Sequence, residues 1–119
     1  MVENFSPEVQ KLAAQFQQQQ QQLKNISMQK QSLSYQKIET ENALEELENI
    51  KKGEEVFKIS GPILIKKSRE DVKKELEDNK EKIENRLKMI EKSEEKIRKT
   101  AMETQEKVQK ILQGEGKKE

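Results

Sequence analysis

The chain has 119 residues, of which 30% are hydrophobic, 3% aromatic and 39% charged. This is too little apolar material for a compact globular core, so the chain either forms long helices that bury a narrow stripe or stays disordered. The formal net charge of +1 gives no long-range attraction for nucleic acid or an anionic membrane surface. The absence of cysteine and histidine excludes disulfides and a zinc site of the usual thiolate or imidazole type.

The first predicted helix covers residues 7–52. Ser6 can cap the free amides, Pro7 suits the first helical position, and Glu8 complements the helix dipole. From Val9 onward, a seam recurs in alternating steps of three and four residues, which is typical of a coiled coil. The expected seam residues are Val9, Leu12, Phe16, Gln19, Leu23, Ile26, Lys30, Leu33, Lys37, Thr40, Leu44 and Leu47. Gly53 is expected to end the helix at about Lys51 or Lys52.

The periodicity changes in residues 54–67. Two short segments rich in β-branched and other apolar residues flank Gly61-Pro62, which predicts a β-hairpin. Such a hairpin is marginal in water, and this one would carry apolar residues on both faces and two open edges. We therefore expect hairpins from several chains to assemble into a shared sheet or β-barrel hub. The expected subunit interface consists of Val56, Phe57, Ile59, Ile63, Leu64 and Ile65. The alternative is a local hydrophobic cap that folds onto its own helices.

The second predicted helix covers residues 69–113. Ser68 and Asp71 resemble a capping box at its start. Its expected seam residues are Leu76, Lys80, Ile83, Leu87, Ile90, Glu94, Ile97, Ala101, Thr104, Val108 and Ile111. Gly114 and Gly116 are expected to end the helix and leave residues 114–119 as a flexible tail. The fold class is therefore mainly α, a single domain over residues 1–119 in which two long helices form an antiparallel coiled coil, with the layer pairing left open.

The two chain ends are expected at the free ends of the helix pair, away from the hairpin. The last turns of a coiled coil fray, which would expose apolar seam residues to a sticky segment of another protein. The expected binding tip consists of Val9, Leu12, Phe16, Val108, Ile111 and Leu112, with Val2 and Phe5 as additional apolar residues. The alternative is that these are ordinary seam residues. The six consecutive glutamines of residues 17–22 are interpreted as a tolerated helical repeat that faces solvent.

The segment between the helices carries a resemblance to a known family. Its residues Val56, Phe57, Lys58, Gly61, Leu64 and Lys66, followed by Glu70 and Leu76, resemble the hinge of the beta subunits of the prefoldin family. The Pro7-Glu8-Val9-Gln10 segment and its glutamine-rich continuation resemble archaeal members, whereas Pro62 stands where other members often have a polar residue. The similarity covers almost the whole chain.

The resemblance implies a function as well as a fold. Two alpha and four beta subunits would form a hexamer around a double β-barrel, and its coiled-coil tips would capture unfolded proteins and deliver them to a group II chaperonin. No nucleotide and no other cofactor is expected, and the chain has no glycine-rich phosphate loop.

Three other classes of protein compete with the chaperone subunit. A structural or tethering coiled-coil adaptor would bind one defined partner with the same helices. A nucleic-acid-binding hairpin arm would need a basic stripe that the balanced charge does not favour. An enzyme is not expected, because paired carboxylates such as Glu45 and Glu46 lack a cleft that would shift their acidity. No hydrophobic run is long enough to cross a bilayer, and together with the absence of cysteine this favours a cytoplasmic protein without a membrane partner.

Overall fold

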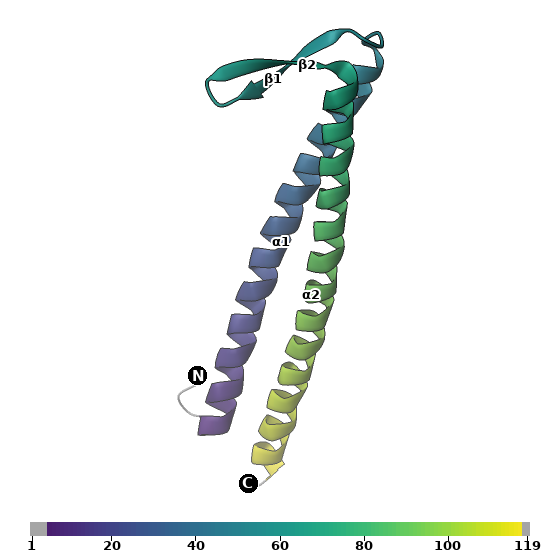
Figure 1. The fold of residues 1–119 in the computed structure, drawn as a ribbon. Helices are drawn as coiled ribbons and strands as arrows, with labels where there is room; N and C mark the ends of the chain where they lie inside the picture. Colours follow the sequence, from purple (N-terminus) through teal and green to yellow (C-terminus); the bar gives the residue numbers. More distant parts are fainter. Residues whose placement is uncertain (1–4, 118–119) are drawn as a thin grey trace. The chain divides into compact units, whose positions relative to one another are not determined.

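The computed structural model describes residues 5–117, with side chains up to residue 114. Helix α1 (Pro7–Glu48) leads into strands β1 (Glu55–Ser60) and β2 (Ile63–Ser68), and helix α2 (Arg69–Lys117) follows (Figure 1). This confirms the predicted fold class of two long helices with an antiparallel hairpin between them. The assembly of hairpins into a barrel involves other chains and stays a prediction, as does the single domain.

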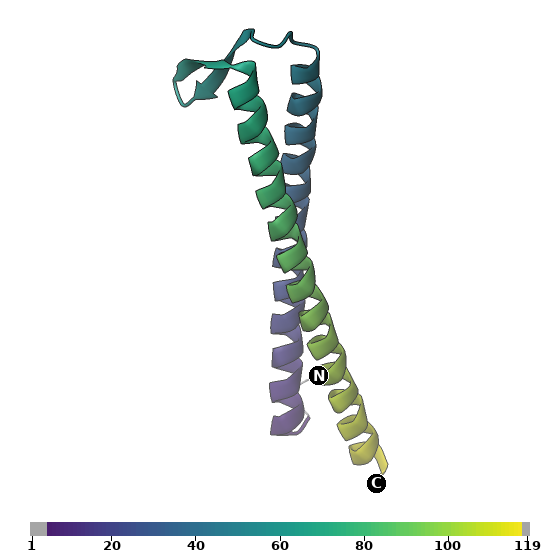
Figure 2. The same ribbon diagram turned by 45° about the vertical axis from the view of Figure 1, so that its right-hand side comes forward.

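The chain divides into two compact units, and the first contains both ends of the chain. It combines residues up to Lys30 with residues from Met89 onward. Within it, the start of α1 and the end of α2 run antiparallel (Figure 2). Val9, Ala101 and Thr104 are its most deeply buried residues. These three positions all belong to the predicted seam, so the heptad pattern identified the buried stripe.

The second unit covers residues 31–88 and contains the end of α1, the hairpin and the start of α2. Leu33, Thr40, Leu47 and Ile83 are buried here, at 4–6% exposure. Across both units, every predicted seam residue is buried or half-buried. This confirms the predicted seam and shows that the core of each unit is a narrow stripe rather than a globular interior.

Both helices begin at the predicted caps. The Ser6 Oγ accepts a hydrogen bond from the Val9 amide at 3.3 Å, and the Ser68 Oγ accepts one from the Asp71 amide at 3.1 Å. Each cap satisfies one of the amides that a helix start leaves without a helical partner. The start signals read from the sequence are therefore confirmed.

The predicted end of α1 at about Lys52 is wrong, because the helix ends at Glu48. The amides of Asn49 and Ile50 bond to carbonyls only three residues earlier, at 3.1 Å each, so the last turn tightens. The chain then makes a separate turn, in which Gly53 adopts a φ of +88° that glycine accepts without strain.

The predicted end of α2 at residue 113 is also wrong, because the helix continues to Lys117. Gly114 does not adopt a positive φ and stays helical. A glycine in a helix interior is unfavourable by only about 1 kcal/mol relative to alanine, which is too little to end a helix by itself. Residues 118 and 119 of the expected tail lie outside the described residues.

The hairpin has a two-residue turn at Gly61-Pro62. The pairing runs from Ser60↔Ile63 next to the turn to Glu55↔Ser68 at the base. Gly61 has a φ of +57°, and a positive φ at the first central position is the requirement of a type II′ turn, which matches the twist of the two strands. Pro62 follows at the second central position, immediately before β2, where its missing amide removes no bond of the ladder.

Candidate assembly and binding surfaces

The hairpin has two distinct faces, because directly paired residues of antiparallel strands project to the same side. One face carries the pairs Val56↔Lys67, Lys58↔Ile65 and Ser60↔Ile63. The other carries the pairs Glu55↔Ser68, Phe57↔Lys66 and Ile59↔Leu64. We call the first the inner face, because its two lysines contact α2, as described below, and we call the second the outer face.

The hairpin leaves large apolar side chains exposed. Of the ten large hydrophobic side chains that are exposed in the described part of the chain, five lie on the hairpin. We call these five the hairpin surface: Phe57, Ile59, Ile63, Leu64 and Ile65, with exposed fractions from 38% to 75%. Val56, the sixth residue of the expected subunit interface, is half-buried. Such a cluster on so small an element is a candidate interaction surface.

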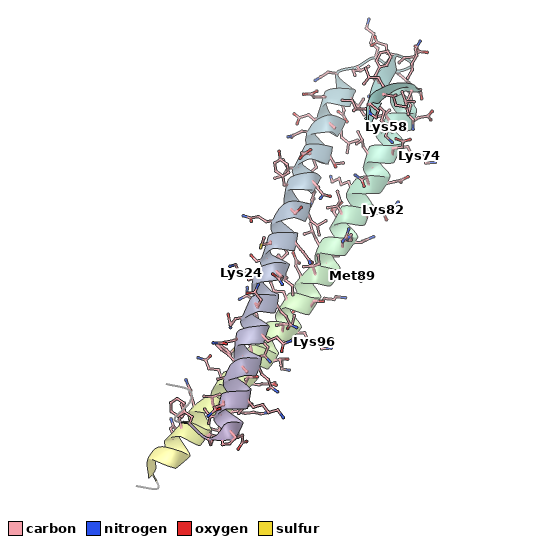
Figure 3. The ribbon with its side chains drawn as sticks, turned by 90° about the vertical axis from the view of Figure 1, so that its left-hand side faces the viewer. Lys24, Lys58, Lys74, Lys82, Met89 and Lys96 are labelled. Atoms are coloured by element: carbon pink, nitrogen blue, oxygen red, sulfur yellow. The ribbon has the colours of Figure 1, made fainter. Side chains whose placement is uncertain are left out.

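A salt bridge between three charged residues joins the hairpin to α2. The Lys58 Nζ lies 3.3 Å from one carboxylate oxygen of Glu75, and Lys67 donates to the other oxygen. The hydrogen bonds from Lys67 and then Lys58 lower the pKa of Glu75 below its usual value. Figure 3 shows Lys58 on the hairpin beside the first turns of α2, the helix that carries Lys74 and Lys82. This arrangement ties both strands to one carboxylate.

A second network closes the base of the hairpin and caps α1. The Arg69 Nε donates to the Leu47 carbonyl at 2.7 Å, and the Arg69 amide donates to the Glu54 carbonyl at 3.1 Å. The carboxylate of Glu70 accepts a bond from the Gly53 amide at 3.1 Å. Bonds from its own backbone amide and from that of Gly53 lower the pKa of Glu70. The first residues of α2 therefore stabilise the end of α1.

The polar residues of the predicted seam are largely paired across it. Lys30 bonds to Glu94 at 3.0 Å in the first unit, and this bond is the main reason that the pKa of Glu94 is lowered. In the second unit, Lys37 lies 3.7 Å from Glu84, and Lys80 lies 3.4 Å from Glu41. Ion pairs of this kind contribute little stability but penalise other registers.

Three further seam positions carry polar groups of a different kind. The hydroxyls of Thr40 and Thr104 donate to the carbonyls of Gln36 and Thr100 on their own helices, at 2.8 and 3.0 Å. The Gln19 Oε1 is buried without a hydrogen-bond partner among the described residues, so the prediction that residues 17–22 face solvent is wrong at Gln19, although the other five glutamines are exposed. Since a buried polar atom without a partner costs about 1–3 kcal/mol, Gln19 weakens the first unit.

A groove crosses the helix pair of the first unit. Two adjoining hollows of about 200 Å³ each share Phe16 and Gln105, and we call them together the terminal groove. Ala13 and Val108 line one hollow, and Leu23, Ala101 and Met102 line the other. Each hollow alone is smaller than a typical small-molecule pocket of about 300–1,000 Å³. A hollow of this size can accept a single apolar side chain of a polypeptide.

The structure places the expected tip residues in this first unit with differing exposure. Val9 is 2% exposed, and Leu12, Phe16, Val108, Ile111 and Leu112 are half-buried. Only Phe16 and Val108 line the terminal groove. Met102, which was not among the expected tip residues, also lines it and is 62% exposed. Its signal in the sequence was its place directly after the seam residue Ala101. Val2 lies outside the described residues.

Neither helix, within residues 5–117, contains a stretch long and apolar enough to cross a membrane.

Comparison with known proteins gave one consistent result. The profile of a family described as "Prefoldin subunit" matches residues 10–115. Over 106 residues, the chain is 44% identical to the prefoldin subunit beta of Archaeoglobus fulgidus, which covers 89% of this chain and 91% of that relative. The structure is similar to the crystal structure of the prefoldin beta subunit from Thermococcus strain KS-1, with a TM-score of 0.83 and 30% identity, over 92% of this chain and 96% of that one.

Proposed function

The chain belongs to the prefoldin subunit family, and from that premise we propose that it is a beta-type subunit of a cytoplasmic, ATP-independent molecular chaperone. The family is one of chaperones and not of enzymes. In the proposed assembly, four copies of the chain and two prefoldin alpha subunits form a hetero-hexamer. This hexamer captures unfolded proteins through its coiled coils and delivers them to a group II chaperonin.

The observation that carries the proposal is the exposure of the hairpin surface. Phe57, Ile59 and Leu64 are 64–75% exposed on the outer face, and among the described residues 5–117 both strands have a free edge. Burying such a side chain fully is worth about 1.5–3 kcal/mol, and the hairpin does not obtain this gain from its own helices while these three side chains stay exposed. Pairing with the hairpins of other prefoldin subunits would cover the apolar side chains and complete the strand edges together.

The terminal groove supports the second half of the proposal, the capture of unfolded proteins. It combines apolar walls with the amide side chains of Gln17, Gln20 and Gln105 and the guanidinium of Arg98. Non-native proteins share exposed apolar side chains and little else, so a shallow groove with apolar walls suits many of them. Val9 is fully buried, so it can contact a client only after the helix ends fray.

The assembly is tested by one pair of substitutions on exposed isoleucines. Ile59→Lys places a charge on the hairpin surface, whereas Ile38→Lys places one on an exposed site of α1. We expect Ile59→Lys to reduce the mass of the complex formed with the alpha subunit, and Ile38→Lys to leave it unchanged. Native mass spectrometry measures both. An intact hexamer with Ile59→Lys would contradict the hairpin hub.

The chaperone activity is tested on several unrelated denatured proteins by light scattering. We expect the assembly to suppress their aggregation, and deletion of residues 1–8 and 109–119 to weaken that suppression while the hexamer persists. Met102→Gln should also weaken it, whereas Met28→Gln, a substitution at an equally exposed methionine outside the groove, should not. Suppression of only one protein would favour a tethering adaptor, and equal effects of the two methionine variants would refute the groove.

A further inference from the structure

The hairpin would be able to bury either of its apolar faces, and something must decide which one is offered to other subunits. The inner face carries Val56, Ile63 and Ile65, and the outer face carries Phe57, Ile59 and Leu64. Both sets are aliphatic or aromatic and of similar size. Apolar burial is non-directional, so it does not by itself select between the faces.

Polar contacts make the two faces different. Both inner lysines, Lys58 on β1 and Lys67 on β2, reach the same carboxylate of Glu75 on α2. On the outer face, Lys66 instead forms an ion pair with Glu55 of the neighbouring strand at 2.5 Å. This ion pair lies within the hairpin and does not connect it to a helix. The inner face is thus tied to α2 by charge, while no ion pair ties the outer face to either helix in the part of the chain that the structure describes.

Near this salt bridge, apolar packing adds little to the contact between the hairpin and α2. A groove lined by Lys58, Glu75, Leu76, Asp78, Asn79 and Lys82 separates the hairpin from α2 at this point. Leu76 is the one apolar residue in that lining. Ile65, on the inner face, is still 38% exposed, and only Val56 is half-buried. Beyond the bonds of Arg69 and Glu70 at the base of the hairpin, the two ion pairs to Glu75 are therefore the polar contacts that hold the strands against α2.

From this geometry we propose that Glu75 is a positioning residue for assembly, which holds Lys58 and Lys67 against α2 so that the outer face is presented to other subunits. The proposal rests on the proposed function, because it assumes that the hairpin is the assembly surface. A single exposed ion pair contributes little, but a carboxylate that joins two strands forms a network that restricts the direction of the hairpin as well as its contact. Without it, the hairpin would visit other orientations, and only a fraction of the molecules would be competent to assemble.

The test is the dissociation of the complex with the alpha subunit as salt is raised, followed by analytical ultracentrifugation. We expect Glu75→Gln to shift the midpoint of dissociation to lower salt. Glu77→Gln, at an exposed site two residues further along α2, should leave the midpoint unchanged. Circular dichroism should show the same helix content in both variants, which separates a loss of positioning from a loss of folding.

Charge reversal provides a rescue that a merely structural role would not produce. The double variant Lys58→Glu and Lys67→Glu repels Glu75 and should assemble less than the wild type, and the addition of Glu75→Lys should restore assembly. The positioning role would be overturned if the wild type assembles and Glu75→Gln has no effect, or if the charge reversal does not restore assembly. Either result would leave the proposed assembly through the hairpin intact. Failure of the wild type to assemble through its hairpin, by contrast, would refute the proposed function itself.

Discussion

Arg69 offers the sharpest test of how the two helices are joined, because its side chain caps a helix that it does not belong to. Its Nε donates to the Leu47 carbonyl at 2.7 Å, and its side chain is only 14% exposed. Arg69→Met retains the aliphatic length of the side chain and removes the donor and the charge. The substitution therefore tests the capping bond with little change in packing.

The expected loss of stability follows from what remains at Leu47. Its carbonyl also accepts a bond from the Ile50 amide at 3.1 Å, so it is not left without a partner. A hydrogen bond from a charged donor contributes about 1.5–3 kcal/mol, and the favourable position of a cation at a helix C-terminus adds about 0.3–1 kcal/mol. Because one acceptor bond persists, we expect the free energy of unfolding to fall by about 1–2 kcal/mol, near the lower limit of these values.

Urea unfolding followed by far-UV circular dichroism measures this loss. With an m value of about 2 kcal/mol per molar, the midpoint should fall by roughly 0.5–1 M. All variants are compared at one protein concentration, since association stabilises the folded chain. Arg98→Met is the matched control, because Arg98 is 64% exposed and its contact is an ion pair with Glu94 on the same helix. Equal midpoints for the two variants would refute the capping role of Arg69.

Three further predictions concern the seam and its charges. Gln19→Leu removes a buried oxygen that has no partner, so it should raise the free energy of unfolding by about 1–2 kcal/mol. The control Gln18→Leu lies on the exposed face and should change this free energy by less than about 0.5 kcal/mol. Urea unfolding measures both variants. The pKa of Glu94 is lowered in the folded chain. The contribution of Glu94 to the free energy of unfolding is therefore present above pH 4.5, and it is lost as the pH falls through the lowered pKa of the folded chain. The urea midpoint of Glu94→Gln should therefore fall less than that of the wild type as the pH is lowered. An equally steep fall in the two proteins would contradict this. Lys30→Met should have the same effect on the pH dependence, since Lys30 is the main cause of the shift.

The seam was predictable because its signal is local. A coiled-coil helix buries residues at steps of three and four, and this spacing depends on helix geometry alone. Even polar members such as Lys30 and Glu94 were predicted to be seam residues. Their mutual bond at 3.0 Å was not, because it depends on the layer pairing of the two helices, which several registers satisfy from sequence alone.

The features that the sequence did not reveal depend on contacts between distant residues. The end of α1 was placed too late because Gly53 is a local stop signal, whereas the actual end is stabilised by Arg69, 22 residues beyond Leu47. Similarly, Glu75 is one of many glutamates on α2, and only the orientation of the hairpin distinguishes it. The exposure of Met102 beside the terminal groove also depends on how closely the neighbouring helix approaches.

The hairpin exposes more apolar side chains than the terminal groove, and this difference determines how the proposed chaperone would hold a client. The outer face of the hairpin offers three exposed side chains, Phe57, Ile59 and Leu64, at about 1.5–3 kcal/mol each, which offsets a large part of an association cost of about 4–15 kcal/mol. The terminal groove offers one exposed methionine and a half-buried Phe16, which supports only weak and reversible binding by a single chain. Retention of a client therefore requires several grooves to engage it at once, because linked weak sites raise the effective concentration of one another. A chain that cannot assemble through its hairpin should for this reason lose holding activity even though its own groove is intact.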